Sequence, residues 1–357
     1  MIASGQVLEA RKAIDIIGRP RWRRRFPPVS GDMIVGARRR GDTTMRAALH
    51  EQWNAPLHVV DITRPEPAAG EVRIAVRATS VNPIDIYTGL NAGYEQSMRL
   101  PFVPGWDVAG VVDALGYGVT RHAVGDRLFG LASFPYPAGA YAEYLTAPAF
   151  HLASMPVSSS FAEGACLPMA ALTAWQMLDA CEVSAGRRVL VSGASGGVGH
   201  LAVQLAVARG AIVIALARPR YHRLLSDLGA TSCVDYADPS AVRAIEEVDA
   251  VIDLVGHDFG RSLFDLTAAG GTVALACAWS IPNYRAAADA LGIRAVSCLV
   301  EPDSATLDAV AALTDAGRLR VVVGARFALA HAVEAQQWVR RREGFGKAAI
   351  EVTPESI

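Results

Sequence analysis

The sequence lacks any uninterrupted run of about 18 uncharged apolar residues, the length that a membrane-spanning helix requires, although hydrophobic residues make up 52% of its 357 positions. A membrane partner is therefore not expected. The net charge of −1 gives no overall basic field to attract nucleic acid, so we expect no nucleic acid partner either. A chain of this length can bury large cores and suffices for two domains.

Cysteine is sparse, and none occurs between Met1 and Ala165. The remainder contains five cysteines without a C-x-x-C pair, namely Cys166, Cys181, Cys233, Cys277 and Cys298. Scattered thiols are more typical of a reducing compartment than of a disulfide framework or a zinc cluster. We therefore expect unpaired thiols and a cytoplasmic protein.

The first 44 residues differ in composition from the rest, with ten basic residues against four acidic ones. Three interpretations are open: a disordered basic arm, a targeting peptide, or translation assigned from too early a start codon. The run that begins at Met45 is typical of a first strand. We therefore expect residues 1–44 to be a dispensable or artefactual extension.

Two different patterns follow this extension. From Met45 to about Pro168, short strand patterns are broken by turns rich in Gly and Pro, which predicts a mainly β unit. From about Ala170, strands alternate with helical segments, which predicts an α/β fold with a doubly wound parallel sheet. Its six strands are expected at Arg188–Ser192, Ala211–Ala217, Thr231–Val234, Ala250–Leu254, Thr272–Ala276 and Arg294–Leu299.

The tail beyond Ser304 returns to a mixed pattern. It predicts a helix, a short strand near Val321, a second helix through Ala332 to Arg341, and a final strand from Lys347 to Val352.

A glycine-rich turn follows the first strand of the α/β pattern, and an apolar helical segment continues from it to Arg209. A dinucleotide pyrophosphate binds exposed backbone N–H groups at the start of such a helix. A tight turn without a ligand uses similar residues, but the flanking strands favour a nicotinamide dinucleotide site. Gly199 would let the helix lie close to the strand. Gly196 and Gly197 would let the backbone come within contact distance of the phosphate oxygens.

The end of the second strand indicates which dinucleotide is bound. An NAD site usually places Asp or Glu about 20 residues beyond the glycine loop, and the segment from Ala215 to Arg223 has no carboxylate. Arginine offers a planar fork of donors that matches a phosphate. We therefore expect NADPH, with Arg218 the first candidate for the 2′-phosphate and Arg220 the second. The alternative is that these arginines form a solvated helix start.

Several ordered motifs between Met45 and Val352 resemble the medium-chain dehydrogenase/reductase superfamily, and within it the zinc-independent NADPH:quinone oxidoreductase branch. Besides the glycine loop, the resemblance rests on Ser80–Asp85, Pro101–Val112, Val124–Arg127, Gly139–Tyr144, Ala171–Gln176 and Gly346-Lys347. It implies a GroES-like β domain over residues 45–170 and 303–357, and a Rossmann domain over residues 171–302 that binds NADPH. It also implies a homodimer through paired edge strands, for which Gly271–Ala278 is the expected segment.

Members of the superfamily that use catalytic zinc have a cysteine near Asn82 and Gly-His-Glu where this chain has Gly105-Trp106-Asp107. Asn82 and Trp106 cannot replace a thiolate and an imidazole as zinc ligands. We therefore expect no metal. A substrate that is already electron-poor, such as a quinone or an α,β-unsaturated carbonyl, can accept hydride without a Lewis acid.

The resemblance also assigns site residues. It implies that Asn82 and Thr173 lie near the nicotinamide, that Tyr236 lies close to the 2′-phosphate, and that Lys347 contributes a second cation. It also implies that the pyrophosphate is held by Ser195, Gly196, Gly197, Val198 and Gly199. Val255 and Gly256 follow a strand end and should line the cofactor groove.

Tyr87 is the candidate oxyanion donor, and a packed aromatic is the alternative. Asp85 and Asp107 form a possible carboxylate pair, for which bracing of local loops is favoured over acid/base catalysis.

The expected function is hydride transfer from NADPH to a small quinone or enone. One alternative within the same chemistry is reduction of an enoyl thioester or a biosynthetic alkene. A second is a non-catalytic NADPH-binding protein that acts through partners, including nucleic acid contacts made by the basic arm.

Overall fold

The computed structural model describes residues 43–342 and 344–352. The extension expected over residues 1–44 lies outside them except for its last two residues. The described chain opens with an antiparallel hairpin of β1 (Thr44–Leu49) and β2 (His58–Thr63).

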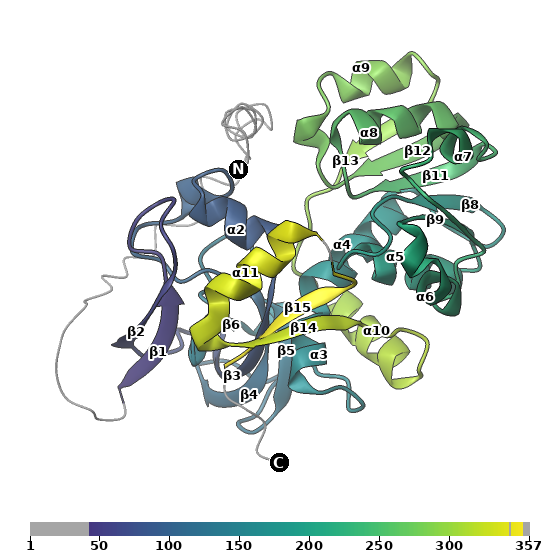
Figure 1. Cartoon of the computed structure of the whole chain (residues 1–357). Coiled ribbons are helices and arrows are strands. Elements are labelled where there is room, and N and C mark those ends of the chain that lie inside the picture. The colour runs from purple at the N-terminus through teal and green to yellow at the C-terminus, as the bar shows by residue number, and fades with distance from the viewer. Residues whose placement is uncertain (1–42, 343, 353–357) are drawn as a thin grey trace.

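A seven-stranded sheet forms the first unit, in the order β14-β15-β3-β4-β5-β7 with β6 also paired to β3. The last strand of the chain, β15, therefore lies between β3 and β14, and Figure 1 shows β14 and β15 side by side. The mainly β unit and its completion by the tail agree with expectation. The strands are β3 (Glu71–Val81), β4 (Asp107–Leu115), β5 (Arg127–Leu131), β6 (Tyr144–Pro148), β7 (Leu152–Ser154), β14 (Val323–Ala328) and β15 (Lys347–Glu351).

The second unit is a six-stranded parallel sheet in the order β10-β9-β8-β11-β12-β13. The predicted α/β class with a doubly wound sheet is thus confirmed. The strands are β8 (Arg188–Val191), β9 (Ile212–Leu216), β10 (Ser232–Val234), β11 (Val248–Asp253), β12 (Thr267–Leu275) and β13 (Arg294–Ser297). The helices associated with it are α5 (Gly199–Ala208), α6 (His222–Asp227), α7 (Pro239–Arg243), α8 (His257–Ser262) and α9 (Tyr284–Asp289).

The expectation that Gly271–Ala278 is an edge segment is wrong. Within it, β12 pairs with β11 on one side and with β13 on the other, so its backbone groups are used in both directions. The edges of this sheet are β10 and β13.

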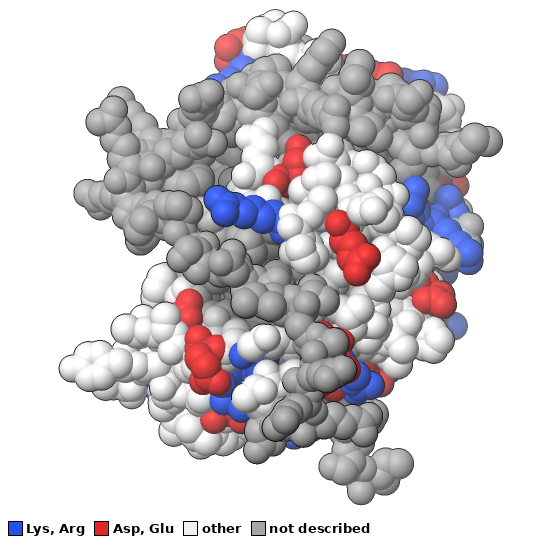
Figure 2. All heavy atoms as spheres, turned by 90° about the vertical axis from the view of Figure 1, so that its left-hand side faces the viewer, with Lys and Arg blue, Asp and Glu red and all other residues white. Residues whose placement is uncertain are grey.

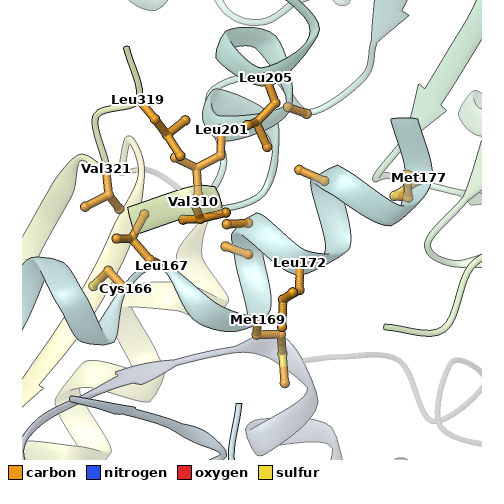
Figure 3. Close-up of a cluster of buried hydrophobic side chains, with 14 of the residues drawn as sticks. Cys166, Leu167, Met169, Leu172, Met177, Leu201, Leu205, Val310, Leu319 and Val321 are labelled. Carbon is orange, nitrogen blue, oxygen red and sulfur yellow. The ribbon is translucent and has the colours of Figure 1, made fainter. Parts of the chain in front are cut away.

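One helix, α4 (Pro168–Ala180), connects the two units, and the boundary expected between residues 170 and 171 falls inside it. Most of its residues are buried, as in a helix that packs on nearly all sides. Figure 3 shows Leu172 of α4, Leu201 of α5 and Val310 of α10 (Ser304–Asp315) in one apolar cluster. The two units therefore share a continuous core.

The remaining helices lie on the first unit: α2 (Pro83–Gly89), α3 (Phe161–Ala165) and α11 (Ala332–Arg341). In the described part of the chain, no helix combines the length and apolar character needed to cross a membrane. On the face shown in Figure 2, acidic and basic side chains of the described residues are interspersed, and neither sign forms a broad patch.

The five cysteines are unpaired, as expected, and three of them are half-buried while two are buried. Burial raises the pKa of Cys166 and Cys181 to about 12. It raises the pKa of Cys277 and Cys298 to about 11, and that of Cys233 in the same direction. All five side chains are therefore thiols, not thiolates, at neutral pH.

Candidate cofactor and active site

The glycine loop joins β8 to α5 as the sequence predicts. A Cβ atom on Gly199 would collide with the carbonyl oxygen of Gly193 and with Ala194, so only glycine allows the helix to start this close to the strand. No described residue accepts a hydrogen bond from the backbone N–H of Gly197 or Val198. These donors precede the first turn of α5, and they fit the pyrophosphate of a dinucleotide.

Two of the residues expected at the 2′-phosphate meet at neighbouring strand ends. Arg218 follows β9, and its Nε donates a hydrogen bond of 2.8 Å to the hydroxyl of Tyr236, beyond β10. Arg220 lies in the next turn, with its guanidinium over the ring of Tyr221 at 4.9 Å from the centroid. The structure therefore brings Arg218 and Tyr236 together, with Arg220 on the adjacent turn.

The expected groove residues Val255 and Gly256 follow β11, and their turn is fixed by Asp253, which sequence reasoning missed. The buried Asp253 carboxylate accepts hydrogen bonds from Ser192 Oγ at 2.7 Å and from the N–H groups of Val255 at 3.0 Å and Gly256 at 3.1 Å. Gly256 has φ = 72°, a conformation that favours glycine. A carboxylate that ends an apolar strand was the available signal.

A buried polar cluster occupies the meeting point of β3, β4 and β15. Its centre is the Asp107 carboxylate, which is 0% exposed. This carboxylate accepts hydrogen bonds from Ser80 Oγ at 2.5 Å, from Asn82 Nδ2 at 2.8 Å and from the backbone N–H of Met169 at 2.7 Å. Its charge faces the Lys347 ammonium at 3.4 Å.

The ammonium of Lys347 also donates to Asn82 Oδ1 and to the carbonyl of Val81 at 3.3 Å. The Lys347 ammonium thus lies beside Asn82 and Asp107, whereas we expected it to be a second cation beside the 2′-phosphate. The reason is the pairing of β15 with β3, in which Ala348 faces Val81, so that the preceding Lys347 comes level with Asn82. Its aliphatic stem passes the glycine loop, where a Cβ on Gly197 would press against it.

Asp85 braces the short helix α2. Its Oδ2 accepts hydrogen bonds from the Asn82 N–H at 2.8 Å and from the Tyr141 hydroxyl at 3.0 Å. Complete burial, with a smaller contribution from the charge of Asp107, raises the pKa of Asp85 to about 7. Both carboxylates of the possible pair thus hold local structure, in line with the favoured interpretation.

The remaining expected residues lie on helices. Thr173 is half-buried on α4, and its hydroxyl donates a hydrogen bond of 2.6 Å to the Met169 carbonyl. Tyr87 is half-buried on α2, and no described residue forms a hydrogen bond with its hydroxyl.

His200 is a further residue at this site that sequence reasoning missed. It lies fully buried on α5, with Nδ1 at 2.8 Å from the Gly196 carbonyl and Nε2 at 3.1 Å from the Val322 N–H. Burial lowers the pKa of His200 to about 4, and the positive charges of Lys347 and Arg320 act in the same direction. The imidazole is therefore neutral at physiological pH. The sequence around His200 shows no residue spacing that is typical of a functional site, because the histidine lies within a buried, apolar helix.

Comparison with known proteins gives matches over most of the chain. A family model described as alcohol dehydrogenase GroES-like domain matches residues 68–157, and one described as zinc-binding dehydrogenase matches residues 228–350. A trans-enoyl reductase from Aspergillus terreus is 38% identical over 221 residues, which are 57% of this chain and 72% of the relative. A 2-methylene-furan-3-one reductase from Solanum lycopersicum is 34% identical over 233 residues, 63% of this chain, and the chain spans only 60% of its length.

Two solved structures extend these matches. The quinone oxidoreductase from Coxiella burnetii superimposes with a TM-score of 0.83 at 33% identity, covering 87% of this chain and 100% of its own. A mycobacterial protein solved in complex with NADPH has a TM-score of 0.77 at 30% identity, covering 86% of this chain and 100% of its own.

The buried ion pair generates a stability prediction. Replacing Lys347 by methionine leaves Asp107 buried without its cation, so we expect Lys347→Met to lower the free energy of unfolding by about 3 to 5 kcal/mol in urea titrations. The matched control is Arg121→Met. It removes an exposed ion pair with Asp308, 2.7 Å long, and should cost less than about 1 kcal/mol. Equal losses in the two variants would contradict the burial of this ammonium.

The lowered pKa of His200 generates a pH prediction. As pH falls, the unfolded chain binds a proton near pH 6.5, whereas the folded chain binds it only near pH 4. The stability contributed by neutral His200 is thus complete above pH 6.5 and is lost as pH falls to about 4, by about 3 kcal/mol. We measure the free energy of unfolding at several pH values in this range. As pH falls from 6.5 to 4, this free energy should decrease less in His200→Gln than in the unmodified protein. Identical pH profiles would refute the assignment.

Proposed function

Because the chain belongs to the medium-chain dehydrogenase/reductase superfamily and is quinone oxidoreductase-like, we propose that it transfers hydride from NADPH to a quinone or an α,β-unsaturated carbonyl without zinc. The observation that carries the choice of NADPH is the contact between Arg218 and Tyr236 at the ends of β9 and β10. A guanidinium and a phenol at this place supply donors to a 2′-phosphate. The mycobacterial neighbour complexed with NADPH supports the same choice.

Zinc-independent chemistry is supported by the residues at the positions of the superfamily's zinc ligands. Both ends of the Asn82 amide are engaged, by Asp107 and by Lys347. Trp106 is buried, and its indole N–H donates to the carbonyl of Tyr136 at 2.7 Å. Neither side chain offers the thiolate or imidazole that zinc prefers, and an ammonium already provides the positive charge of this cluster.

In the proposed reaction, each site residue has a separate role in binding the cofactor or stabilising the acceptor. Bound NADPH supplies the hydride, which adds to an electron-poor carbon of the acceptor. The loop from Ser195 to Gly199 binds the pyrophosphate, and Val255 and Gly256 line the groove. Asn82, held by Lys347 and Asp107, orients the nicotinamide end together with Thr173. The negative charge that develops on the acceptor oxygen is stabilised by a donor, for which Tyr87 is the candidate, and a proton completes the reduction.

A second candidate acceptor is an enoyl thioester or another specialised alkene. The observation in its favour is the match to a trans-enoyl reductase, which is 38% identical over 57% of this chain. The hydride chemistry and the cofactor residues are the same in both cases. The two candidates therefore differ in the acceptor pocket alone.

Turnover under anaerobic conditions tests the proposal. The chain from Met45 should consume NADPH with a simple quinone or a simple enone, and it should use NADH much more slowly. The preferred acceptor distinguishes the quinone from the alkene candidates, and an enoyl thioester extends the series. Saturable NADPH binding without consumption by any of these acceptors would favour the non-catalytic alternative.

Arg218→Asp tests the 2′-phosphate assignment. The substitution removes a charge-assisted donor and adds a carboxylate that suits the ribose hydroxyls of NADH, so we expect the preference for NADPH over NADH to fall by about tenfold to a hundredfold. Ratios of kcat/KM for the two cofactors measure it. Arg223→Asp makes the same charge change at an exposed position of α6 and should leave the ratio within about twofold. An unchanged ratio in Arg218→Asp would rule out its role.

A further inference from the structure

Helix α5 of the parallel sheet is hydrogen-bonded to the segment that leads into β14 of the other sheet. Gln204 binds both polar groups of the Arg320 backbone, its Nε2 donating to the carbonyl at 2.9 Å and its Oε1 accepting from the N–H at 2.8 Å. One turn earlier on the helix, His200 Nε2 lies 3.1 Å from the backbone N–H of Val322. The two side chains thus join the units on the side of α5 that faces this segment.

The contacts of His200 determine its tautomer. The N–H of Val322 can only donate, so Nε2 is the acceptor and the proton of the neutral ring is on Nδ1. Nδ1–H then donates to the Gly196 carbonyl at 2.8 Å. The ring therefore joins the backbone of the glycine loop to the backbone of Val322.

The Gly196 carbonyl belongs to the same peptide plane as the Gly197 N–H. In a trans peptide these two groups point in opposite directions. The His200 imidazole and the His200 backbone N–H, which donates to the same carbonyl at 3.2 Å, together hold the carbonyl towards the helix. The Gly197 N–H therefore points outwards, away from α5, where no described residue accepts it. Two consecutive glycines do not hold such an orientation by themselves.

The connection continues into the buried polar cluster around Asp107. The N–H of Gly346 donates to the Ser195 carbonyl at 2.9 Å, and the N–H of Lys347 donates to the Val322 carbonyl at 2.9 Å. The hydrogen bonds therefore form a closed circuit through the glycine loop, His200, Val322 and Lys347. The ammonium of Lys347 extends it to Asn82.

We propose that His200 is a positioning residue that links the phosphate-binding loop to Lys347, so that NADPH binding and the geometry at Asn82 depend on each other. The inference rests on the proposed function in taking the glycine loop as the NADPH site. His200 contacts neither substrate nor reacting atoms in this role. It acts through the Gly196 carbonyl on one side and through Val322 and Lys347 on the other.

Three substitutions separate the two contacts of the ring. His200→Asn keeps a donor near Gly196 but does not reach Val322, His200→Gln keeps an acceptor for Val322, and His200→Phe removes both contacts. We expect the Kd for NADPH, measured by fluorescence, to rise about tenfold in His200→Phe and His200→Gln and to stay within about threefold in His200→Asn. We expect kcat to fall about tenfold in His200→Asn, because its link to Lys347 is cut. Gln204→Met is the matched control, with an unchanged Kd.

Amide hydrogen exchange in the cofactor-free protein tests the link without NADPH. In His200→Phe, the N–H groups of Gly346 and Lys347 should exchange at least tenfold faster than in the unmodified protein, whereas those of β12 should not change. Unchanged exchange at Gly346 and Lys347 would overturn the inference whatever the loop binds. So would a His200→Phe variant that binds NADPH with the original Kd. Failure of the unmodified protein to bind NADPH, with accelerated exchange in the variant, would instead reject the proposed function alone.

Discussion

The antiparallel pairing of β15 with β3 is the interaction on which the site depends. It joins the last strand to the third: the contact between Lys347 and Val81 spans 266 residues. The entropic cost of closing a loop rises only slowly with its length, and the first four residues of β15 are buried, so the pairing is a stable part of the sheet. It aligns Lys347 with Asn82 and brings Gly346 against the glycine loop. Each half of the site is thereby attached to the other through backbone hydrogen bonds.

The polar cluster at this junction is viable because its members satisfy one another. Removing an ammonium and a carboxylate from water is costly, and their attraction offsets the cost only when further hydrogen bonds complete their shells. Asp107 has such bonds from Ser80, Asn82 and Met169. Asp85, close by, retains its proton up to about pH 7, which limits the repulsion between the two carboxylates. Asp85 and His200 change the free energy of unfolding with pH in opposite directions. Compared with the unfolded state, the folded state binds the Asp85 proton more tightly and the His200 proton more weakly.

The features that could be predicted from the sequence are those set by local patterns. The glycine loop, the six parallel strands and the helix over Ala332–Arg341 follow from spacing and composition, and the structure has them at nearly the expected bounds. The errors concern long-range contacts. The order of the strands makes β13, and not β12, an edge of the parallel sheet. The register of β15 on β3 determines where the Lys347 ammonium lies. The roles of Asp253 and His200 were not predicted, because they depend on the Ser192 hydroxyl 61 residues away and on the Val322 N–H 122 residues away.

The raised pKa values of the cysteines bear on the chemistry of the proposed electron-poor acceptors. Quinones and enones are alkylating agents, and a thiolate adds to them far faster than the protonated thiol does. With the pKa of Cys166 and Cys181 near 12, and those of Cys277 and Cys298 near 11, only a minute fraction of any of these side chains is nucleophilic at neutral pH. The packing around these cysteines thus also gives the chain an intrinsic tolerance of reactive electrophiles, a property that suits the proposed acceptors.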